Sequence, residues 1–440
     1  MRGAATGGTR SVESEGDVLL VGYSTRALAD AALRSGFRPR TVDFYGDLDQ
    51  KARVENVALG RDLGLPWSAL EAVRAAERFN SKRVAYAFDL ENRPEAVERL
   101  ARGRELLGNT ASTLRAVRDP ARLFGVLGAA GLPTPITIFA DAAGAGRPGF
   151  APSSPPHEGG PEPGSARAGT GRRWLVKPLR AGGGRGIARA EPGRIPGPEE
   201  MLQELVEGPV LGFSFLADGE QVRPLGLAAQ ITEARAFGGT RFGYVGSLSR
   251  LPAGLDQGSV REQAARAALV VTRACGLTGW NGMDFVVRKG EVVVLEVNPR
   301  HTSSMELWDG PGARLFAAHA DACRGRIDGT WLPEPGEVRG KALLFARRAV
   351  RAQEALAQAE ALSGAAWPER AVADVPHPGE RIARGQPVCS LFATGPSAAA
   401  CLAALRELAD RVEAQLEADG AEPAGRPAPA SSGGAAGGLA

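Results

Sequence analysis

From Gly282 to Arg300 the chain reads GMDFVVRKGEVVVLEVNPR, and this stretch decides the fold. Two valine-rich runs flank Arg288-Lys289-Gly290, a pattern that predicts a β-hairpin with those three residues as its loop. In that register Asp284 lies opposite Val294, and Glu296 is its diagonal neighbour on the same face of the hairpin.

The two faces of this hairpin are expected to differ in chemistry. Asn298 follows Glu296 by two residues and therefore shares its face. A two-residue turn would instead put Asp284 and Glu296 on opposite faces and bury one carboxylate unpaired, which is costly. Two carboxylates and an amide oxygen suit Mg²⁺ together with substrate phosphates; a polar face toward solvent is the alternative. The other face is expected to be wholly apolar, with Met283, Phe285, Val287, Val293, Leu295 and Val297.

A phosphate-binding pattern precedes the hairpin. Residues 174–178 are an expected strand that delivers Lys177, and a cluster of Gly182, Gly183, Gly184, Arg185 and Gly186 follows. Consecutive glycines let backbone N–H groups turn toward an anion, and a nearby ammonium group neutralises phosphate charge. We interpret the cluster as a loop that covers phosphates, with a flexible linker as the alternative. The Walker A pattern G-x-x-x-x-G-K-[ST] is absent.

The segment between these two features is expected to be a helix end followed by a hairpin. Residues 202–208 follow a helical pattern that ends at Gly208, and residues 212–217 predict a strand before a turn at Asp218-Gly219. Taken alone, this segment predicts only local structure.

The chain opens with a β-α-β pattern. Residues 17–22 predict a strand, a helical pattern runs to about Ser35, residues 41–45 predict a second strand, and residues 83–88 predict another parallel strand. This opening is typical of a Rossmann-like sheet. Its first turn lacks G-x-G-x-x-G, so a structural turn is favoured over a dinucleotide site.

Composition limits the class of protein. The 440 residues suggest roughly two to four folding units. A net charge of +3 does not favour a nucleic-acid partner. No apolar run approaches the roughly 18 residues that span a bilayer, and residues 1–16 lack the apolar core of a signal peptide, so no membrane partner and a cytoplasmic location are expected. The 4 cysteines are far apart, which indicates buried thiols.

Taken in order, the lysine strand, glycine loop, segment 202–208 and acidic hairpin resemble the ATP-grasp superfamily, in particular predicted ATP-dependent carboligases related to biotin carboxylase. The motifs cover roughly residues 110–305. The resemblance implies an α/β and α+β multidomain fold: a Rossmann-like pre-ATP-grasp domain at 16–112, a two-lobed ATP-grasp domain at 113–338, and a small β-rich C-terminal domain at 339–418. The Gly/Pro-rich stretch at about 142–172 indicates a disordered insertion, and residues 422–440 indicate a disordered tail.

The resemblance also implies roles for individual residues, with ATP and Mg²⁺ (or Mn²⁺) as cofactors. Lys177 would contact the α- and β-phosphates, and Gly182 to Gly186, including Arg185, would form a mobile loop over them. Asp284, Glu296 and Asn298 would hold one or two metal ions. Arg300 would act in catalysis by steadying the substrate carboxylate or the acyl phosphate. Adenine and ribose contacts would come from Gln203, Glu204, Val206 and Glu207.

One position departs from the family pattern. Where family members often have an Asp-Lys pair whose lysine binds phosphate, this chain has Asp119-Pro120. Arg118 or Arg122 is the expected replacement.

The function implied by the resemblance is a ligase that activates a carboxylate as an acyl phosphate and joins it to an amine, both small molecules. Its place would be small-molecule biosynthesis, of a one-carbon cofactor of the tetrahydromethanopterin or methanofuran type. A kinase-like phosphoryl transferase and a non-catalytic ATP-binding regulator are the alternatives. The acceptor pocket would be built from residues 230–244 and 302–307, and a homodimer is compatible with this interpretation. Biotin-dependent carboxylation is disfavoured, because no Met-Lys-Met motif occurs.

Overall fold

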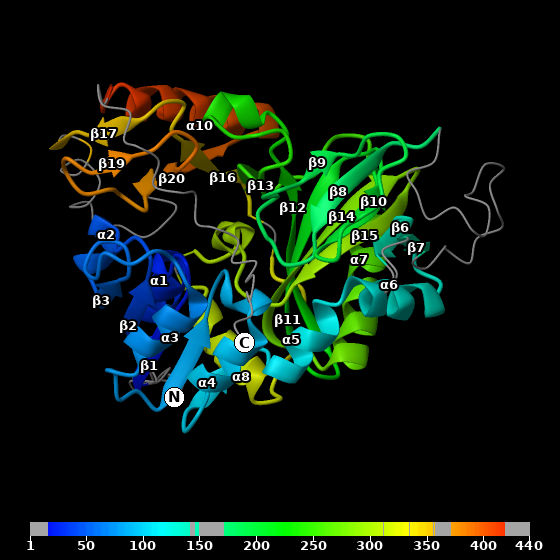
Figure 1. Cartoon of the computed structure of the whole chain (residues 1–440), viewed down its shortest axis with the longest axis horizontal. Helices are drawn as coiled ribbons and strands as arrows, with labels where there is room; N and C mark the ends of the chain where they lie inside the picture. The colour runs from blue at the N-terminus through cyan, green and yellow to red at the C-terminus, as the bar shows by residue number, and fades with distance from the viewer. Residues whose placement is uncertain are drawn as a thin grey trace, which may run out of the picture.

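The computed structural model describes residues 16–140, 146–148, 171–310, 312–333, 335–354, 356 and 371–418. Figure 1 shows an N-terminal α/β part in blue, central sheets in green, and a C-terminal part with strands in orange and helix α10 in red. The insertion expected at about 142–172 and the tail expected at 422–440 lie outside the described residues, apart from 146–148, 171 and 172. The mixed α/β and α+β fold class is confirmed.

The N-terminal part is a parallel sheet with the strand order β3-β2-β1-β4-β5. Its strands are β1 (Gly16–Val21), β2 (Phe37–Asp43), β3 (Glu55–Ala58), β4 (Arg83–Tyr86) and β5 (Glu105–Leu107). Its helices are α1 (Arg26–Arg34), α2 (Leu48–Lys51), α3 (Ala69–Ala76), η1 (Leu90–Asn92) and α4 (Pro94–Leu100). The strand order reverses between β1 and β4, and in such sheets ligands bind beyond the carboxyl ends of the strands at that point.

Both faces of strand β1 are buried, as expected for a central parallel strand. Val18 and Leu20 pack with Leu28 of α1 in a core that extends to Trp280 of the central sheet. Leu19 and Val21 pack on the opposite face, in a core with helices α3 and α4. The N-terminal sheet is thus attached to the central part through a shared hydrophobic core.

The central part contains two antiparallel sheets. The smaller has the order β7-β6-β10-β8-β9, with β6 (Thr137–Ala140), β7 (Gly146–Pro148), β8 (Trp174–Pro178), β9 (Ala188–Arg189) and β10 (Glu200–Glu204). The larger has the order β15-β14-β11-β12-β13-β16-β20-β18. Its first strands are β11 (Val210–Asp218), β12 (Val222–Gln230), β13 (Gly246–Leu248), β14 (Thr278–Arg288) and β15 (Glu291–Asn298). Helices α6 (Pro120–Ala129) and α7 (Gln257–Cys275) cover one face of the hairpin β14–β15, and short α5 (Ala111–Val117) leads into α6.

The larger sheet continues into the C-terminal part of the chain. Strand β13 pairs with β16 (Val338–Phe345), which pairs with β20 (Pro387–Gly395), and β18 (Val372–Ala373) forms the edge. The other elements are η2 (Ala234–Phe237), η3 (Ser303–Leu307), α8 (Leu315–Cys323), α10 (Ala398–Glu413) and a small sheet of β17 (Val350–Ala352), β19 (Arg381–Ile382) and β21 (Leu416–Ala418). No helix in the described part of the chain is both long and apolar enough to span a bilayer.

The hairpin loop differs from the prediction. Its loop is the two residues Lys289 and Gly290, whose φ angles of 53° and 85° suit a type I′ turn. A β-bulge then shifts the register between Asp284 and Phe285, so that Asp284 pairs directly with Glu296 and Leu295 is the extra residue. The expected three-residue loop is therefore wrong, yet the two carboxylates still share a face.

The bulge also changes the composition of the two faces. Met283, Phe285 and Val287 pack in the main core as predicted, together with Val292, Val294 and Val297. Val293 and Leu295 do not join them. They pack instead with Val206 and Val286, on the face that carries Asp284.

The segment predicted as a helix end is strand β10. Met201, Leu202 and Gln203 are buried and pair with β6 on one side and β8 on the other. The ladder partners lie far away in the sequence, and their hydrogen bonds override the local helical pattern. The strand predicted over residues 212–217 lies within β11.

Candidate active site

The acidic trio, defined as Asp284, Glu296 and Asn298, is brought together by the bulged pairing of β14 and β15. The Asn298 side-chain amide donates to Asp284 Oδ2 at 3.0 Å and to Glu296 Oε1 at 3.4 Å. Gln230, at the end of β12, donates from Nε2 to Asp284 Oδ1 at 3.1 Å. Neutral donors therefore hold two adjacent carboxylates in place.

The two carboxylates differ in how readily they ionise. Burial raises the pKa of Asp284 to about 7, and the neighbouring Glu296 adds to the rise. Burial also opposes ionisation of Glu296, but Lys177 and Arg118 hold its pKa below the ordinary value. A bound cation would favour ionisation of both carboxylates.

The donor set of the trio fits Mg²⁺ or Mn²⁺. In the described residues, no group of three or more His, Cys, Asp or Glu side chains is arranged to hold a metal ion. The trio supplies two carboxylates and one amide, the number of protein ligands expected where substrate phosphates complete the coordination.

Lys177 extends from β8 of the smaller sheet. Its side chain is 7% exposed, and Nζ donates to Gln203 Oε1 at 3.1 Å. Gln203 is also buried, and its Nε2 has no hydrogen-bond partner among the described residues. Because the charge of Lys177 lowers the pKa of Glu296, the lysine of one sheet lies within electrostatic reach of the trio on the other.

The glycine loop has the backbone that phosphate binding needs. Gly183, Gly184 and Gly186 have positive φ angles of 64°, 75° and 74°. In the described chain, the N–H groups of Gly182, Gly183, Gly184 and Gly186 donate no backbone hydrogen bond, so they are available to an anion. A side chain at Gly184 is excluded, since its Cβ would lie 1.8 Å from the carbonyl oxygen of Phe242.

The residues expected near adenine have varied surroundings. The Glu204 N–H donates to Ile136 O at 2.8 Å, and its carboxylate pairs with Arg172 at 3.0 Å. Exposed Glu207 pairs with Arg173. Val206 packs against Val286 and Val293 in a small apolar cluster, with Val210 and Leu295 at its edge.

Arg300 lies at the end of the hairpin, beside the trio. Its Nε donates to Glu91 Oε1 at 2.5 Å, its Nη2 reaches Asn298 Oδ1 at 3.5 Å, and its Cζ lies 5.0 Å from the centre of the Phe88 ring. Burial raises the pKa of Glu91, against the opposing influence of Arg300. Sequence reasoning missed Glu91 and Phe88. Their position just after β4, at the carboxyl edge where the strand order reverses, was the available signal.

Pro120 occupies the position where the family pattern has a phosphate-binding lysine, and here it begins helix α6. Asp119 caps helix α6 by accepting from the N–H groups of Ala121 and Arg122 at 2.9 and 3.3 Å, and Pro120 is the first helical residue. Arg118 donates to Asn92 Oδ1 at 2.8 Å and to Ala181 O, just before the glycine loop, at 3.0 Å.

Arg118 also donates to the Val297 carbonyl at 3.3 Å, which ties it to the end of the hairpin. Arg122 is exposed and donates to Ala274 O at 3.4 Å instead. Of the two candidate replacements, only Arg118 lies at the trio.

One of the two segments expected to form the acceptor pocket, residues 230–244, contacts the trio. Gln230 contacts Asp284, and the buried hydroxyl of Tyr244 is 3.0 Å from Ser247 Oγ. Burial raises the pKa of Tyr244 to about 12. His301, next to Arg300, is 8% exposed, and burial lowers its pKa to about 3, so the imidazole is neutral. Tyr244 and His301 are therefore neutral hydrogen-bonding groups, whereas Glu306 of the second segment carries a charge that is paired with Arg26 and Lys341.

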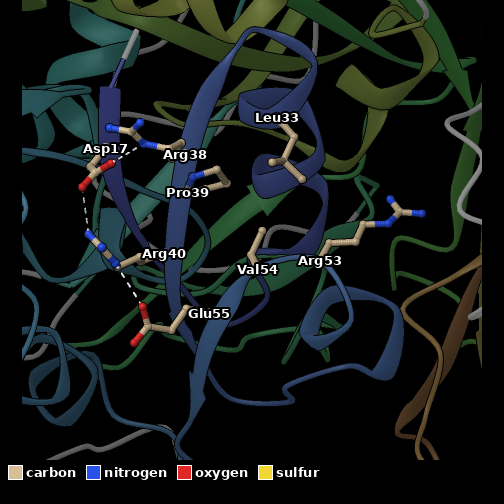
Figure 2. Close-up of a pocket in the computed structure, with 8 residues that line it drawn as sticks. All are labelled: Asp17, Leu33, Arg38, Pro39, Arg40, Arg53, Val54 and Glu55. Atoms are coloured by element: carbon tan, nitrogen blue, oxygen red, sulfur yellow. Dashed lines mark hydrogen bonds and ion pairs between the residues drawn. The ribbon is translucent and has the colours of Figure 1, made fainter. Parts of the chain in front are cut away.

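A pocket of about 270 Å³ lies elsewhere, at the amino ends of β1, β2 and β3. Figure 2 shows Arg38 and Arg40 turned toward Asp17, and Arg40 toward Glu55. These charged side chains form ion pairs with one another. The pocket also lies at the opposite end of the sheet from Phe88. We do not include it in the candidate active site.

A family model described as "ATP-grasp domain" matches residues 161–304. The chain carries an ATP-grasp domain, which confirms the resemblance drawn from the motifs. No curated protein sequence matches the chain.

Among solved structures, N5-carboxyaminoimidazole ribonucleotide synthetase from Thermus thermophilus aligns with a TM-score of 0.60 at 20% identity, over 90% of this chain and 98% of its own. L-amino acid ligase from Bacillus licheniformis aligns with a TM-score of 0.57 at 17% identity, over 92% and 98%. Rhizobium etli pyruvate carboxylase aligns with a TM-score of 0.64 at 16% identity, over 91% of this chain but only 37% of its own length. These three alignments show that the chain has the same fold as the aligned enzymes.

Proposed function

We propose that the protein is an ATP- and Mg²⁺-dependent ligase that activates a carboxylate as an acyl phosphate and joins it to an amine. The observation that carries this proposal is geometric: hydrogen bonds hold the trio together, and Arg118 donates both to Val297 at the end of the hairpin and to Ala181 just before the glycine loop. The named ligases that share the fold support the same reaction class.

The chain's own residues supply each part of nucleotide binding in this proposal. Lys177 and the free N–H groups of Gly182, Gly183, Gly184 and Gly186 bind the phosphates, and the trio holds Mg²⁺ or Mn²⁺. Arg118 supplies the positive charge that the Asp-Lys pair provides elsewhere in the family. The adenine ring lies against the apolar cluster around Val206, and the base and ribose contact Gln203, Glu204 and Glu207. A bound metal ion neutralises charge on the phosphates during transfer.

The reaction takes place beside Arg300. Its guanidinium holds the substrate carboxylate in place through paired hydrogen bonds. One carboxylate oxygen attacks the γ-phosphorus and ADP leaves. The amine nitrogen then attacks the acyl carbon, the C–O bond to phosphate breaks, and the amine loses a proton. The residues contribute positioning and charge stabilisation, the main contributions expected in phosphoryl transfer.

The biosynthetic role that we propose is narrower than the reaction class. We place the enzyme in the cytoplasm, in the synthesis of a one-carbon cofactor of the tetrahydromethanopterin or methanofuran type. This part rests on the resemblance to the carboligase group. The hydroxyl of Tyr244 and the neutral imidazole of His301 suit a polar acceptor.

The test is a screen for ADP release with Mg²⁺ and pairs of carboxylic acids and amines, followed by mass spectrometry of the product. An amide together with ADP and phosphate supports the proposal. A stable phosphorylated product without an amide indicates a kinase-like enzyme, and ATP binding without turnover indicates a regulator.

A matched pair of variants tests Arg118. Arg118→Ala should raise the KM for ATP and lower turnover, whereas Arg122→Ala removes the same charge four residues away and should leave both unchanged. Equal effects of the two substitutions would contradict the role given to Arg118.

A further inference from the structure

Aromatic side chains meet at the carboxyl edge of the N-terminal sheet, with Tyr23 at their centre. The Tyr23 ring stacks on Phe44 with 5.4 Å between centroids, and it meets Tyr45, Trp67 and Phe88 edge-on at 5.2, 5.2 and 6.0 Å. Tyr23 follows β1 and Phe88 follows β4, the two strands between which the strand order reverses. This aromatic cluster therefore lies where a bound substrate is expected.

The glycine loop rests on this cluster through Arg185. The Arg185 Cζ lies 5.1 Å from the centre of the Tyr23 ring and 5.6 Å from that of Phe88. Both distances are within the range of a cation–π interaction. Arg185 is exposed and forms no ion pair with any residue that the structure describes, so its ring contacts are what fix its guanidinium.

Backbone contacts hold the rest of the loop in the same place. A Cβ on Gly182 would lie 2.5 Å from Cε2 of Phe88, so the loop backbone lies directly on that ring. The Gly183 carbonyl accepts from the Tyr244 N–H at 3.1 Å, and the Ala181 carbonyl accepts from Arg118 at 3.0 Å. The loop is thus closed against both the N-terminal sheet and the larger central sheet.

Phe88 connects this closed loop to the reaction site. The ring that contacts Arg185 and Gly182 also lies 5.0 Å from the Cζ of Arg300. Arg300 is bound in turn to Glu91, three residues after Phe88. A shift of the Phe88 ring would therefore disturb the loop and the substrate arginine together.

We propose that Arg185, Tyr23 and Phe88 form a latch that keeps the glycine loop closed, and that Phe88 links this closure to the position of Arg300. The inference rests on the proposed function. With the loop closed, water is kept from the acyl phosphate until the amine attacks. With the loop open, water attacks the same acyl carbon, phosphate leaves, and the carboxylate is regenerated without an amide. Arg185 is then a positioning residue and not a phosphate ligand.

The first test measures the loop directly by hydrogen exchange, with no substrate needed. Arg185→Ala should speed exchange at the Tyr244 N–H, which donates to the Gly183 carbonyl of the closed loop, by about threefold to tenfold, the loss expected for an exposed cation–π contact with two rings. Arg185→Lys should be intermediate, because an ammonium group also binds a ring face. Arg180→Ala, which removes the same charge from the same loop, is the control and should exchange like the wild type. Unchanged exchange in Arg185→Ala would overturn the latch.

The second test measures coupling as the amount of ADP released per amide formed. Arg185→Ala and Phe88→Leu should each raise this ratio about threefold to tenfold, with Arg185→Lys closer to the wild type. Faster exchange without a change in the ratio would overturn the link to Arg300 and leave only a loop anchor. If the wild type forms no amide with any substrate pair, the proposed function fails, and hydrogen exchange still decides the latch.

Discussion

Two buried carboxylate sites lie within a short stretch of the chain and have opposite surroundings. Glu306 of η3 is bonded by Arg26 from the N-terminal part and by Lys341 of β16, and Arg26 also bonds Asp374. Burial opposes its ionisation, but these two cations hold the pKa of Glu306 well below its ordinary value. Asp284, by contrast, accepts from the amides of Gln230 and Asn298 and lies against the Glu296 carboxyl group, and burial together with Glu296 raises its pKa to about 7.

This difference indicates that the Glu306 site contributes to stability and that the trio contributes to activity. The charge of Glu306 is balanced inside the protein by Arg26 and Lys341, which come from two other parts of the chain, so this site joins three parts of the chain. The charge of the trio is left for a ligand to complete. Substitutions at the first site should therefore act on stability, and substitutions at the second on activity.

The largest effect is expected for Glu306→Gln. It leaves Lys341 and one side of Arg26 buried without their carboxylate, which should lower the free energy of unfolding by about 3–5 kcal/mol. Urea denaturation measures this loss. Glu291→Gln, at an exposed glutamate beside the hairpin turn, is the control. A loss below 1 kcal/mol, roughly the value of a surface pair, would remove the distinction between the two sites.

Lys177→Ala and Glu296→Gln should lower activity and leave stability unchanged. Each should lower ATP turnover by about 10²–10³-fold, because Lys177 supplies positive charge to the ATP phosphates and Glu296 is a proposed ligand of the metal ion that neutralises them. The melting temperature should stay close to that of the wild type. Near-normal turnover in either variant would rule out this position of the active site.

The pH dependence of stability should reveal another internally satisfied group, His319. Its Nδ1 accepts from the Trp280 N–H at 2.8 Å, and Nε2 lies 3.2 Å from Leu107 O. Burial lowers its pKa to about 4. Between that value and about 6.5 the unfolded chain binds more protons, so stability is present at neutral pH and is lost as pH falls, by about 1.4 kcal/mol per unit at most.

His319→Asn keeps an acceptor for the Trp280 N–H but does not titrate. Urea denaturation of this variant between pH 4.5 and 7 should show a shallower dependence on pH than the wild type. An identical slope in the two proteins would mean that His319 is not held in its neutral form.

The smallest effect is expected for Gln230→Ala. It removes one neutral donor to Asp284, worth about 0.5–1.5 kcal/mol, and should raise the Mg²⁺ concentration needed for half-maximal turnover by about threefold to tenfold. Gln263→Ala is the matched control, since Gln263 bonds Gly290 O and the Val292 N–H near the turn of the same hairpin. The control should change stability alone. The same Mg²⁺ requirement in both variants would contradict the role of Gln230.

The sequence was sufficient to predict that Asp284, Glu296 and Asn298 lie on one face of the hairpin, although the predicted loop was wrong and the bulge at Leu295 is what brings the two carboxylates to the same face. It was not sufficient for strand β10, whose partners β6 and β8 are distant in the sequence. Phe88 and Glu91 were missed for a related reason. Phe88 contacts Arg185 and Glu91 contacts Arg300, and these contacts can be inferred only when the strand order is known.

The bulge at Leu295 has a consequence for how this hairpin can vary. A two-residue turn followed by one extra residue gives the same pairing of Asp284 with Glu296 as a three-residue turn over residues 289–291 with no extra residue. The extra residue that this pairing requires can therefore lie either in the turn or at the bulge. Deleting Leu295 should remove the bulge and keep the opposed carboxylates, because Asp284 then pairs with Glu296 in the register of the two-residue turn, whereas losing the bulge with Leu295 still present would pair Asp284 with Leu295 and turn Glu296 into the core.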